Sequence, residues 1–346
     1  MDHLTCAVLM SGGVDSSVTA MILKGEGHRP LGVTLLMSPS SSECSRSVQL
    51  ARRTAEILGI RHTVLDLRDL FRRHVMDKFR TEYMAGRTPN PCSDCNRNVK
   101  LGGLAERLDR MGLDGIPMAT GHYARILKDP AGAHLAMGLD HRRDQSYFLA
   151  EVPKGIIRRL MFPLGGMTKE QVRLLAEEAR LPARREADSM DSCFVEDGDY
   201  REVIGPVIDS QGPIVDLRGN VLGIHQGFHR FTVGQRKGLG VSSTEALYVK
   251  RIDPPTVVVA PRDRLMERHV TASGGNWLEE GDLRCGAQLL GKTRSQGRPS
   301  PCTVEEVEGD RIRVLFHGEG VFAPCPGQRL VLYRPDGVVV GCATMD

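Results

Sequence analysis

Residues 6–17 read "CAVLMSGGVDSS", and this stretch decides the predicted fold. An apolar run ends here in a glycine-rich turn, and a helix-patterned segment, "DSSVTAMILKGEG" (15–27), follows directly. In a parallel sheet the carboxyl end of such a strand faces the ligand crevice, and the next helix offers unpaired N–H groups with the positive end of its dipole. The stretch therefore predicts an α/β domain with an anion site after its first strand.

The residues of the turn suit a phosphate. Gly12 and Gly13 let the backbone come close to the ligand, because neither carries a Cβ. Asp15 is placed to hold Mg²⁺ or to cap the helix, and hydroxyl donors are supplied by Ser11, Ser16 and Ser17. The turn is neither G-x-x-x-x-G-K-[ST] nor G-x-G-x-x-G, because the Walker lysine and the third glycine are missing. A glycine-rich turn beside a capped helix is the alternative on these residues alone.

Strand-like and helix-like runs alternate through the first half of the chain. The runs "LGVTLLM" (31–37) and "RHTVLDL" (61–67) predict strands, whereas "SVQLARRTAEILG" (47–59) and "LFRRHVMDKFRTEYMAG" (70–86) predict helices. Such alternation is typical of a parallel sheet with helices on both faces. A further helix is predicted from Thr168, which forms a capping box with Gln171.

The pattern changes after about residue 195. Glycine becomes frequent, and short alternating stretches such as "ALYVKRID" (246–253) and "QRLVLYRPDGVVVG" (328–341) predict antiparallel β structure in small barrels. A weaker boundary falls near residue 265. The prediction is therefore three domains: an α/β catalytic domain at 1–195, a small central β-containing domain at 196–265 and a C-terminal β-barrel at 266–346.

Composition narrows the class of protein. The 346 residues suffice for two or three domains, and 46 basic against 43 acidic side chains give a net charge of +3, too balanced to indicate a nucleic-acid partner by itself. No stretch reaches the roughly 18–20 apolar residues of a membrane span. Nine unevenly spaced cysteines do not resemble a secreted disulfide framework. We therefore expect a soluble cytoplasmic protein. A monomer is expected as well, but composition does not indicate the oligomeric state.

Two of the cysteines stand at C-x-x-C spacing in "TPNPCSDCNRNVK" (88–100). Cys92 and Cys95 could be metal ligands, a redox pair or a nucleophile with its neighbour, and two buried thiols are the alternative. The other cysteines lack paired spacing, and most are expected to be small core residues: Cys6, Cys44, Cys285, Cys302, Cys325 and Cys342.

The turn and six further stretches carry a resemblance. "SGGVDSS" resembles the pyrophosphatase loop (PP-loop) of the ATP α-hydrolase superfamily. The chain as a whole, from residue 9 to about 342, resembles the bacterial tRNA-specific 2-thiouridylases, in the subgroup that contains C-x-x-C. The stretches that carry this likeness occur in order along the chain: "GRTPNPCSDCN" (86–96), "ATGHYAR" (119–125), "RDQSYFL" (143–149), "DSMDSCF" (188–194), "GFHRFTVGQRKGLG" (227–240) and "PGQRLVLY" (326–333).

The resemblance implies an activity and an ATP site. Enzymes of this family adenylate the C2 oxygen of the wobble uridine (position 34) of tRNA and replace it with sulfur, releasing AMP and pyrophosphate. Adenylation is needed because oxide is not a viable leaving group. ATP and Mg²⁺ are the implied ligands, with Leu35 contributing backbone atoms to the adenine. The implied ATP-binding residues are Leu9, Met10, Ser11, Gly12, Gly13, Val14, Asp15, Ser16, Leu35 and Gly121.

The resemblance also assigns the thiols. Cys193 is expected to carry the sulfur as a persulfide, and Cys95 to attack it, releasing sulfide or forming a disulfide. Many family members have aspartate where this chain has Cys92. Three thiolates, from Cys92, Cys95 and Cys193, could instead hold a [4Fe-4S] cluster whose fourth iron binds sulfide. The cluster is the preferred expectation, and a zinc site would need a fourth ligand that the sequence does not offer.

The tRNA contacts implied by the resemblance are spread along the chain: Asn90, Pro91, Cys92, His122, Arg143, Asp144, Gln145, Arg294 and Gln328. Ser295 replaces a tyrosine of the family, so stacking there is in doubt. Basic clusters in "GFHRFTVGQRKGLG" and "VKRID" (249–253) are interleaved with Phe228 and Phe231, which are expected to stack on bases.

The partners implied are tRNA and a sulfur donor, which could be a sulfur-relay protein, a cysteine desulfurase or free sulfide. The chain offers nothing for a membrane. Two rival functions stay open. One is another PP-loop enzyme, either an amidating ligase or a thiolase for a different RNA base. The other is a non-catalytic iron–sulfur or tRNA-binding protein, which would release no AMP.

Overall fold

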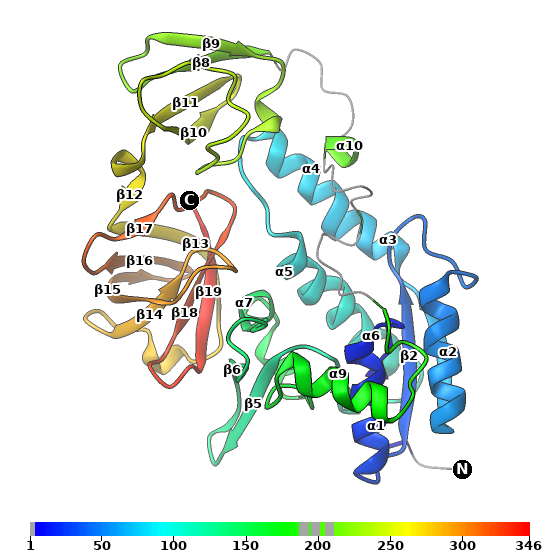
Figure 1. Ribbon diagram of the computed structural model, residues 1–346. Helices are drawn as coiled ribbons and strands as arrows, with labels where there is room; N and C mark the ends of the chain where they lie inside the picture. Colours follow the sequence, from blue (N-terminus) through cyan, green and yellow to red (C-terminus); the bar gives the residue numbers. More distant parts are fainter. Residues whose placement is uncertain (1–3, 187–193, 195–200, 205–210) are drawn as a thin grey trace. The chain divides into compact units, whose positions relative to one another are not determined.

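The computed structural model describes residues 4–186, 194, 201–204 and 211–346 (Figure 1). Its residues divide into two compact units. The first comprises described residues within Met1–Val75, Cys92–Phe194 and Gly337–Val339, and the second those within Met76–Pro91, Val195–Asp336 and Val340–Asp346. The chain thus passes between the units at five positions. These units do not follow the predicted segments one by one, and the boundaries at 195 and 265 stay a prediction.

A five-stranded parallel sheet forms the centre of the first unit, as predicted. Its strands lie in the order β3 (Arg61–Asp66), β2 (Pro30–Leu36), β1 (Cys6–Leu9), β4 (Met118–Ala119) and β7 (Leu160–Met161). Cys6, Ala7 and Val8 are all buried. Because successive side chains of a strand point to opposite faces, helices or loops cover both faces of β1.

Two helices and a third that packs on them frame the first strand. Side chains of α1 (Val14–Gly25) and α2 (Arg46–Leu58) form one apolar cluster with β1. A second cluster joins α1 to α9 (Lys169–Glu178). The predicted capping box of α9 is confirmed, since Gln171 N–H donates to Thr168 Oγ1 over 3.4 Å and Thr168 N–H donates to Gln171 Oε1 over 2.8 Å.

Two segments that read as continuous helices contain π-helical turns instead. The first runs through α3 (Arg68–Phe71), η1 (Arg72–Met76) and α4 (Asp77–Met84), and the second through α5 (Pro91–Cys95), η2 (Asn96–Lys100) and α6 (Gly102–Arg110). The π-turns insert an extra residue per turn, which rotates the following helix, and such turns occur often at functional sites. Of these elements α4 belongs to the second unit, and the other described elements of the first unit are β5 (Ala124–Asp129), β6 (Gly132–Met137), α7 (Ser146–Leu149) and α8 (Lys154–Ile157).

The central β domain lies in the second unit. Its four strands have the order β10 (Leu247–Asp253), β11 (Thr256–Pro261), β8 (Gly212–Val215) and β9 (Val221–His225). β8 and β11 pair in parallel, so the expectation of purely antiparallel β structure is wrong at this pair. A parallel neighbour needs a long crossover, and the chain supplies one through β9 and β10.

The aromatic residues of this domain correct another expectation. Phe228 and Phe231 are 5% and 6% exposed and pack in the core with Val249 and Val257. Phe228 begins the short 3-10 helix η4 (Phe228–Arg230) and Phe231 follows it. Neither can stack on RNA bases, because both rings are enclosed by the protein. Their burial stabilises the domain through the apolar area removed from water.

The C-terminal domain is the predicted barrel. Six strands close in the order β13 (His269–Trp277), β16 (Arg311–Phe316), β15 (Ser300–Glu308), β14 (Gln288–Lys292), β18 (Arg329–Tyr333) and β19 (Val339–Met345). Pairing of β19 with β13 closes the ring. Shorter elements of this unit are α10 (Arg201–Ile204), η5 (Arg262–Leu265), β12 (Met266–Glu267), η6 (Glu280–Asp282) and β17 (Val321–Phe322).

Two further expectations can be compared with the described residues. Cys6, Cys302, Cys325 and Cys342 are buried, whereas Cys44 and Cys285 are exposed, so most of the unpaired-spacing cysteines are core residues as predicted. In the part of the chain that the structure describes, no helix combines the length and the apolar character that crossing a membrane requires.

Candidate active site

The glycine-rich turn connects β1 to α1 in a conformation that its glycine makes possible. Gly12 has φ +77°, in the left-handed region, and a Cβ there would lie 2.1 Å from the carbonyl oxygen of Ser47. Both the backbone angle and the close approach exclude a larger residue. The sequence places glycine here because the chain must turn sharply beside α2.

The hydroxyls of the turn fix its shape. The carbonyl oxygen of Gly13 accepts hydrogen bonds from Ser16 Oγ (3.0 Å) and Ser17 Oγ (2.9 Å). Ser16 Oγ also accepts from Ser11 N–H over 3.2 Å. Gly13 is the N-cap of α1 and makes no side-chain cap bond. The first-turn N–H groups, which have no intrahelical acceptor, therefore remain available to an anion.

A cavity of about 310 Å³ opens at this turn, within the size range of small-molecule sites. It lies where β1, β2 and β4 reach their carboxyl ends. Nine of the ten residues implied to bind ATP line it, namely Leu9, Met10, Ser11, Gly13, Val14, Asp15, Ser16, Leu35 and Gly121. Gly12 is the tenth and instead packs on Ser47. The cavity thus brings together residues from three separate parts of the chain, namely residues 9–16, Leu35 and Gly121.

The cavity has further lining residues that the sequence analysis did not single out: Val33, Met37, Lys100, Thr120, Tyr123 and Lys169. Val33 and Met37 flank Leu35 along and beyond β2, so an apolar wall lies there, suited to a flat base. Gly121 packs directly on α1, since a Cβ would lie 3.0 Å from the backbone carbon of Asp15.

Asp15 forms an ion pair that no sequence pattern indicated. Lys169 Nζ lies 2.8 Å from both carboxylate oxygens of Asp15. Tyr123 OH donates to Asp15 Oδ1 over 2.9 Å. The Lys169 side chain is only 8% exposed, and the Asp15 side chain is 32% exposed. Of the two roles expected for Asp15, side-chain capping of α1 is not observed. The one sequence feature that could have drawn attention to Lys169 is its position directly after Thr168, the predicted N-cap of a helix.

His122 is held as a neutral imidazole. Thr120 Oγ1 lies 2.6 Å from its Nδ1 and accepts its backbone N–H over 3.3 Å. The contact with Oγ1 therefore occupies Nδ1 in either tautomer of the neutral ring. Burial, with a smaller effect of the Lys100 charge, lowers the pKa of His122 from 6.5 to about 3. His122 thus lines the cavity as an uncharged ring.

The three residues at 143–145 that were expected to contact tRNA have different roles in the structure. Arg143 is exposed and lines the cavity. Asp144 accepts from the backbone N–H of Gly138 (3.0 Å) and from Ser146 Oγ (2.8 Å). Gln145 also lines the cavity, and its Oε1 accepts the backbone N–H of Tyr123 over 3.0 Å. The acidic and amide side chains thus hold the local backbone, and Arg143 is the charge presented to ligands.

The C-x-x-C pair lies on α5. Cys92 is exposed and Cys95 is buried, and the i, i+3 spacing puts them one helical turn apart on neighbouring positions. η2 follows at once, and its last residue, Lys100, lines the cavity. Asn96, the first residue of η2, donates from Nδ2 to the carbonyl oxygen of Phe148 over 3.3 Å. One π-turn therefore connects the thiol helix to the cavity.

The third expected thiol cannot be compared with this pair. Cys193 lies outside the described residues, so its convergence on Cys92 and Cys95 stays a prediction. Among residues 4–186, 194, 201–204 and 211–346, no three His, Cys, Asp or Glu side chains gather in a way that could hold a metal ion. The two thiols on α5 supply two of the three ligands that a [4Fe-4S] cluster would require here.

Two expected tRNA contacts meet in the second unit. Asn90 is 5% exposed, and its Nδ2 donates to Gln328 Oε1 over 3.4 Å. Gln328 Nε2 donates to the carbonyl oxygens of Thr88 (3.2 Å) and Pro89 (2.8 Å). Gln328 therefore fixes the backbone just before Pro91, the first residue of α5, although 238 positions separate it from Asn90.

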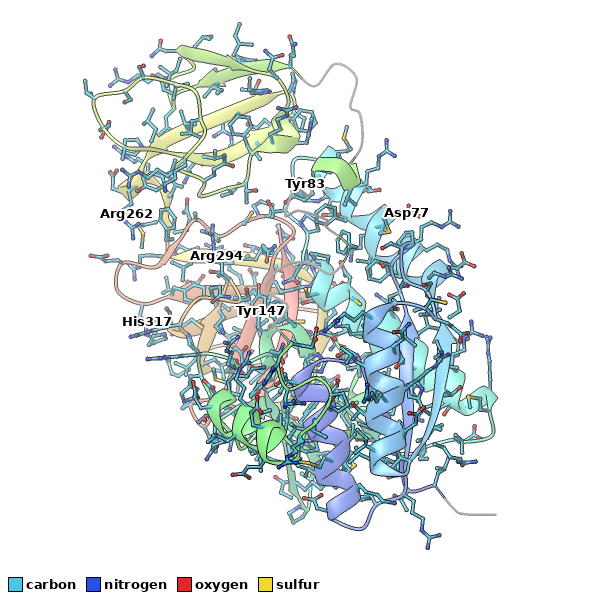
Figure 2. The ribbon with its side chains drawn as sticks, turned by 45° about the vertical axis from the view of Figure 1, so that its right-hand side comes forward. Asp77, Tyr83, Tyr147, Arg262, Arg294 and His317 are labelled. Carbon is cyan, nitrogen blue, oxygen red and sulfur yellow. The ribbon has the colours of Figure 1, made fainter. Side chains whose placement is uncertain are left out.

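Arg294 joins the two β domains of the second unit. Its Nη2 donates to the carbonyl oxygens of Val233 (3.0 Å) and Ala323 (2.9 Å), which belong to the central domain and to the chain after β17. Figure 2 labels Arg294 among the strands of the barrel. Its Nε is buried without a hydrogen-bond partner among the described residues. A guanidinium engaged in this way bridges two domains.

Comparison with known proteins gives family matches along nearly the whole chain. Three family models match in order: "tRNA methyl transferase HUP domain" at residues 4–197, "tRNA methyl transferase PRC-barrel domain" at 204–261 and "Aminomethyltransferase beta-barrel domain" at 267–345. These descriptions agree with the parallel sheet, the central β domain and the six-stranded barrel described above.

Several curated relatives align end to end. A protein of Acidithiobacillus ferrooxidans is 40% identical over 343 residues, covering 96% of each chain. One of Carboxydothermus hydrogenoformans is 42% identical over 354 residues and covers 96% of this chain and 95% of its own. One of Picosynechococcus is 41% identical over 343 residues, with 97% and 96% covered. All three bear the name tRNA-specific 2-thiouridylase MnmA.

Proposed function

The chain belongs to the tRNA-specific 2-thiouridylase family, and from this we propose that it is an ATP-dependent tRNA sulfurtransferase. In the proposed reaction it adenylates the C2 oxygen of the wobble uridine of tRNA and replaces that oxygen with sulfur, releasing AMP and pyrophosphate. The cavity at the glycine-rich turn, with its polar turn on one side and its apolar wall on the other, is the observation that carries the proposal.

The residues of the cavity fit ATP with Mg²⁺. The turn and the N-terminus of α1 present N–H and hydroxyl donors to phosphate oxygens, and the wall around Leu35 suits the adenine. Asp15 provides the carboxylate oxygens that Mg²⁺ prefers. When bound, Mg²⁺ neutralises charge on the phosphates during adenylation. His122 contributes an uncharged ring rather than a cation, because its pKa lies well below physiological pH.

Sulfur delivery is the finer part of the proposal. In the persulfide route, the thiolate of Cys95 attacks the Cys193 sulfur that bears the extra sulfur atom. The S–S bond of the persulfide breaks, a Cys95–Cys193 disulfide forms and hydrosulfide leaves with the electron pair. Hydrosulfide then adds to C2 of the adenylated uridine and AMP departs with the former oxygen. A dithiol reductant is needed to restore both thiols.

Cys92 favours the alternative with an iron–sulfur cluster. A third thiol beside Cys95 has no part in the persulfide route, whereas Cys92, Cys95 and Cys193 together would supply three cluster ligands. When bound, such a cluster supplies one iron coordination position for inorganic sulfide. We propose that these three residues hold it. The donor would then be free sulfide, with a sulfur-relay protein or cysteine desulfurase serving the persulfide route.

The proposed substrate is tRNA, which the protein is expected to bind as a monomer. The wobble base must be splayed from its stack for C2 to reach a buried site. Arg143 at the cavity, together with exposed basic side chains of the central domain such as Arg230 and Arg236, suits contact with phosphates. Domain boundaries at 195 and 265 remain part of the proposal.

The deciding experiment is anaerobic turnover with ATP, sulfide and unmodified tRNA, with and without reconstituted iron, with 2-thiouridine and AMP measured by mass spectrometry. We expect tRNA-dependent AMP and 2-thiouridine in equal amounts. An amidating ligase would release AMP without thiolated tRNA, and a non-catalytic binding protein would release no AMP. Either result would overturn the proposal.

Three cysteine variants separate the two sulfur routes. Cys193→Ala should abolish thiolation in both, with tRNA binding retained. Cys92→Asp restores the residue of many relatives, so it should lose iron and sulfide-dependent activity if the cluster operates, and keep activity if the persulfide operates. Cys285→Ser changes an exposed cysteine of the C-terminal domain and serves as the control that alters neither.

A further inference from the structure

Lys169 stands at a helix position that disfavours a positive charge, and its side chain is buried in an ion pair with Asp15. It is the first residue of α9, where a positive charge opposes the helix dipole. Its side chain is also 8% exposed, and lysine is rarely buried unless paired. A residue that violates local preferences in this way is often retained for function. Its backbone is fixed by the capping box at Thr168 and by an N–H bond to Asp140 Oδ2 of 3.2 Å.

The position of the ammonium group points to a ligand. Lys169 Nζ lines the cavity and lies beside the turn whose sequence lacks the Walker lysine. α9 packs along α1, so the ammonium comes to the turn from a helix 154 residues further along the chain. It also lies 5.9 Å from the ring centroid of Tyr123, which helps to hold Asp15 from the other side.

We propose that Lys169 is the phosphate-binding cation of the ATP site, exchanging Asp15 for the β- and γ-phosphates when MgATP enters. Both carboxylate oxygens of Asp15 lie within 2.8 Å of Lys169 Nζ, so Mg²⁺ and the ammonium compete for them. The ammonium that Mg²⁺ displaces stays within the cavity, where the polyphosphate is its new partner. Lys169 then stabilises the negative charge that develops on pyrophosphate as it leaves. This inference rests on the proposed function, since it takes the cavity to be the ATP site.

Ligands that differ in their number of phosphates distinguish a phosphate-binding role of Lys169 from a structural one. Affinities of ATP, pyrophosphate and AMP for the full-length protein are measured by calorimetry. Lys169→Met should weaken ATP and pyrophosphate binding at least tenfold and AMP binding less than threefold, because AMP lacks the β- and γ-phosphates. Lys169→Arg should recover most of the loss. Lys24→Met removes an exposed lysine from the far end of α1 and should change none of the three affinities.

A metal-free comparison controls for misfolding of the Lys169→Met variant, in which the half-buried carboxylate of Asp15 loses its ammonium partner. In the presence of a chelator, Asp15→Asn should bind ATP several-fold more tightly than the wild type, because Lys169 is released from its pair. The double variant, Asp15→Asn with Lys169→Met, carries neither charge and should lose that gain and at least a further tenfold. A merely structural pair predicts equal affinities for the single and double Asp15 variants.

The outcomes separate this inference from the function on which it rests. Wild-type thiolation and ATP binding, together with unaltered ATP affinity in Lys169→Met, would overturn the role of Lys169 alone. Equal losses for ATP and AMP would also overturn it, since they indicate general distortion of the site. A wild-type protein that binds no ATP would overturn both proposals.

Discussion

His122 stays uncharged because its ring is enclosed and because Lys100 adds positive charge nearby. The unfolded chain binds a proton at this residue below pH 6.5, whereas the folded protein does so only near pH 3. Stability is therefore unaffected above pH 6.5 and falls as pH is lowered from 6.5 towards 3. The folded site keeps the same uncharged ring throughout the physiological range.

We predict that the His122 ring signal in an NMR titration stays constant between pH 5 and 8, with His122→Gln identifying it among the eleven histidines. The same variant should remove acid sensitivity of about 2 kcal/mol between pH 6.5 and 5, at roughly 1.4 kcal/mol per pH unit, measured by urea unfolding. A titration midpoint near 6.5 for this signal would contradict the neutral assignment.

Gly12 gives a second prediction at the scale of one residue. Gly12→Ala should reduce ATP affinity at least tenfold, because its Cβ would overlap the carbonyl oxygen of Ser47 and move the turn. Gly27→Ala is the matched control, since Gly27 also has positive φ (+85°) but has no atom within 4 Å of the added Cβ. It should cost about 1 kcal/mol of stability through backbone strain and leave ATP affinity unchanged. Equal ATP affinities for Gly12→Ala and Gly27→Ala would contradict the prediction.

Single residues also show where sequence reasoning ends. The turn at Gly12 and Gly13 was predictable because its backbone chemistry is local. Lys169 was not, because nothing in the sequence relates it to a carboxylate 154 positions earlier. Phe228 and Phe231 were misassigned to an RNA surface, because aromatic residues beside arginines look alike whether their rings face solvent or the core.

At the scale of elements, the N-terminus of α9 controls where the Lys169 ammonium lies. Thr168 holds the first turn through its capping box, while Ser45, the N-cap of α2, makes no side-chain cap bond. Thr168→Ala should therefore lower stability by about 1 kcal/mol and Ser45→Ala by less than half of that. Circular dichroism at 222 nm during heating measures both.

The same two variants test whether the cap of α9 also affects ATP binding. If the cap positions Lys169, Thr168→Ala should also weaken ATP binding several-fold, whereas Ser45→Ala should not. A Thr168→Ala protein that is destabilised yet binds ATP like the wild type would show that the cap serves only the helix.

Elements were predictable to different degrees. The parallel sheet and the barrel strands follow from hydrophobic periodicity, since each buries one face or both. The capping box of α9 follows from the spacing of Thr168 and Gln171. The π-turns at Arg72–Met76 and Asn96–Lys100 do not, because one extra residue in a helical turn leaves the apolar pattern almost unchanged. The parallel pairing of β8 with β11 depends on contacts between residues 43 positions apart, Ile214 with Val257 and Val215 with Val258, which local patterns do not encode.

On the scale of the whole molecule, Arg294 is one polar link between the central domain and the barrel in the second unit, beside the ion pair of Lys250 with Glu267. Arg294→Met should leave two carbonyl oxygens without their donor and lower stability by about 2–4 kcal/mol. The two domains should then unfold at separate temperatures. Trp277, the only tryptophan, lies on β13 and reports the barrel by fluorescence, and circular dichroism reports the remainder.

Arg298→Met is the control for this prediction. Arg298 lies four residues further along the same loop and is exposed, so its removal takes away equal charge without breaking a bridge. A single unfolding transition in both variants would contradict the bridging role. Loss of tRNA affinity without loss of stability in Arg294→Met would instead support the contact that the sequence implied.

The route of the chain between the two units bears on protein synthesis. The unit that contains the cavity is completed by residues near the end: Gly337 supplies a carbonyl oxygen to Met137 N–H, and Val338 bridges to Ala136. Residues 76–91, made early, belong with segments made much later. A ribosome releases the N-terminal end first, so nascent chains emerge with these partners missing. The unit that contains the cavity therefore gains its last strand contacts only once translation is nearly over, whereas the residues named as lining the cavity, from Leu9 to Lys169, are all made in the first half.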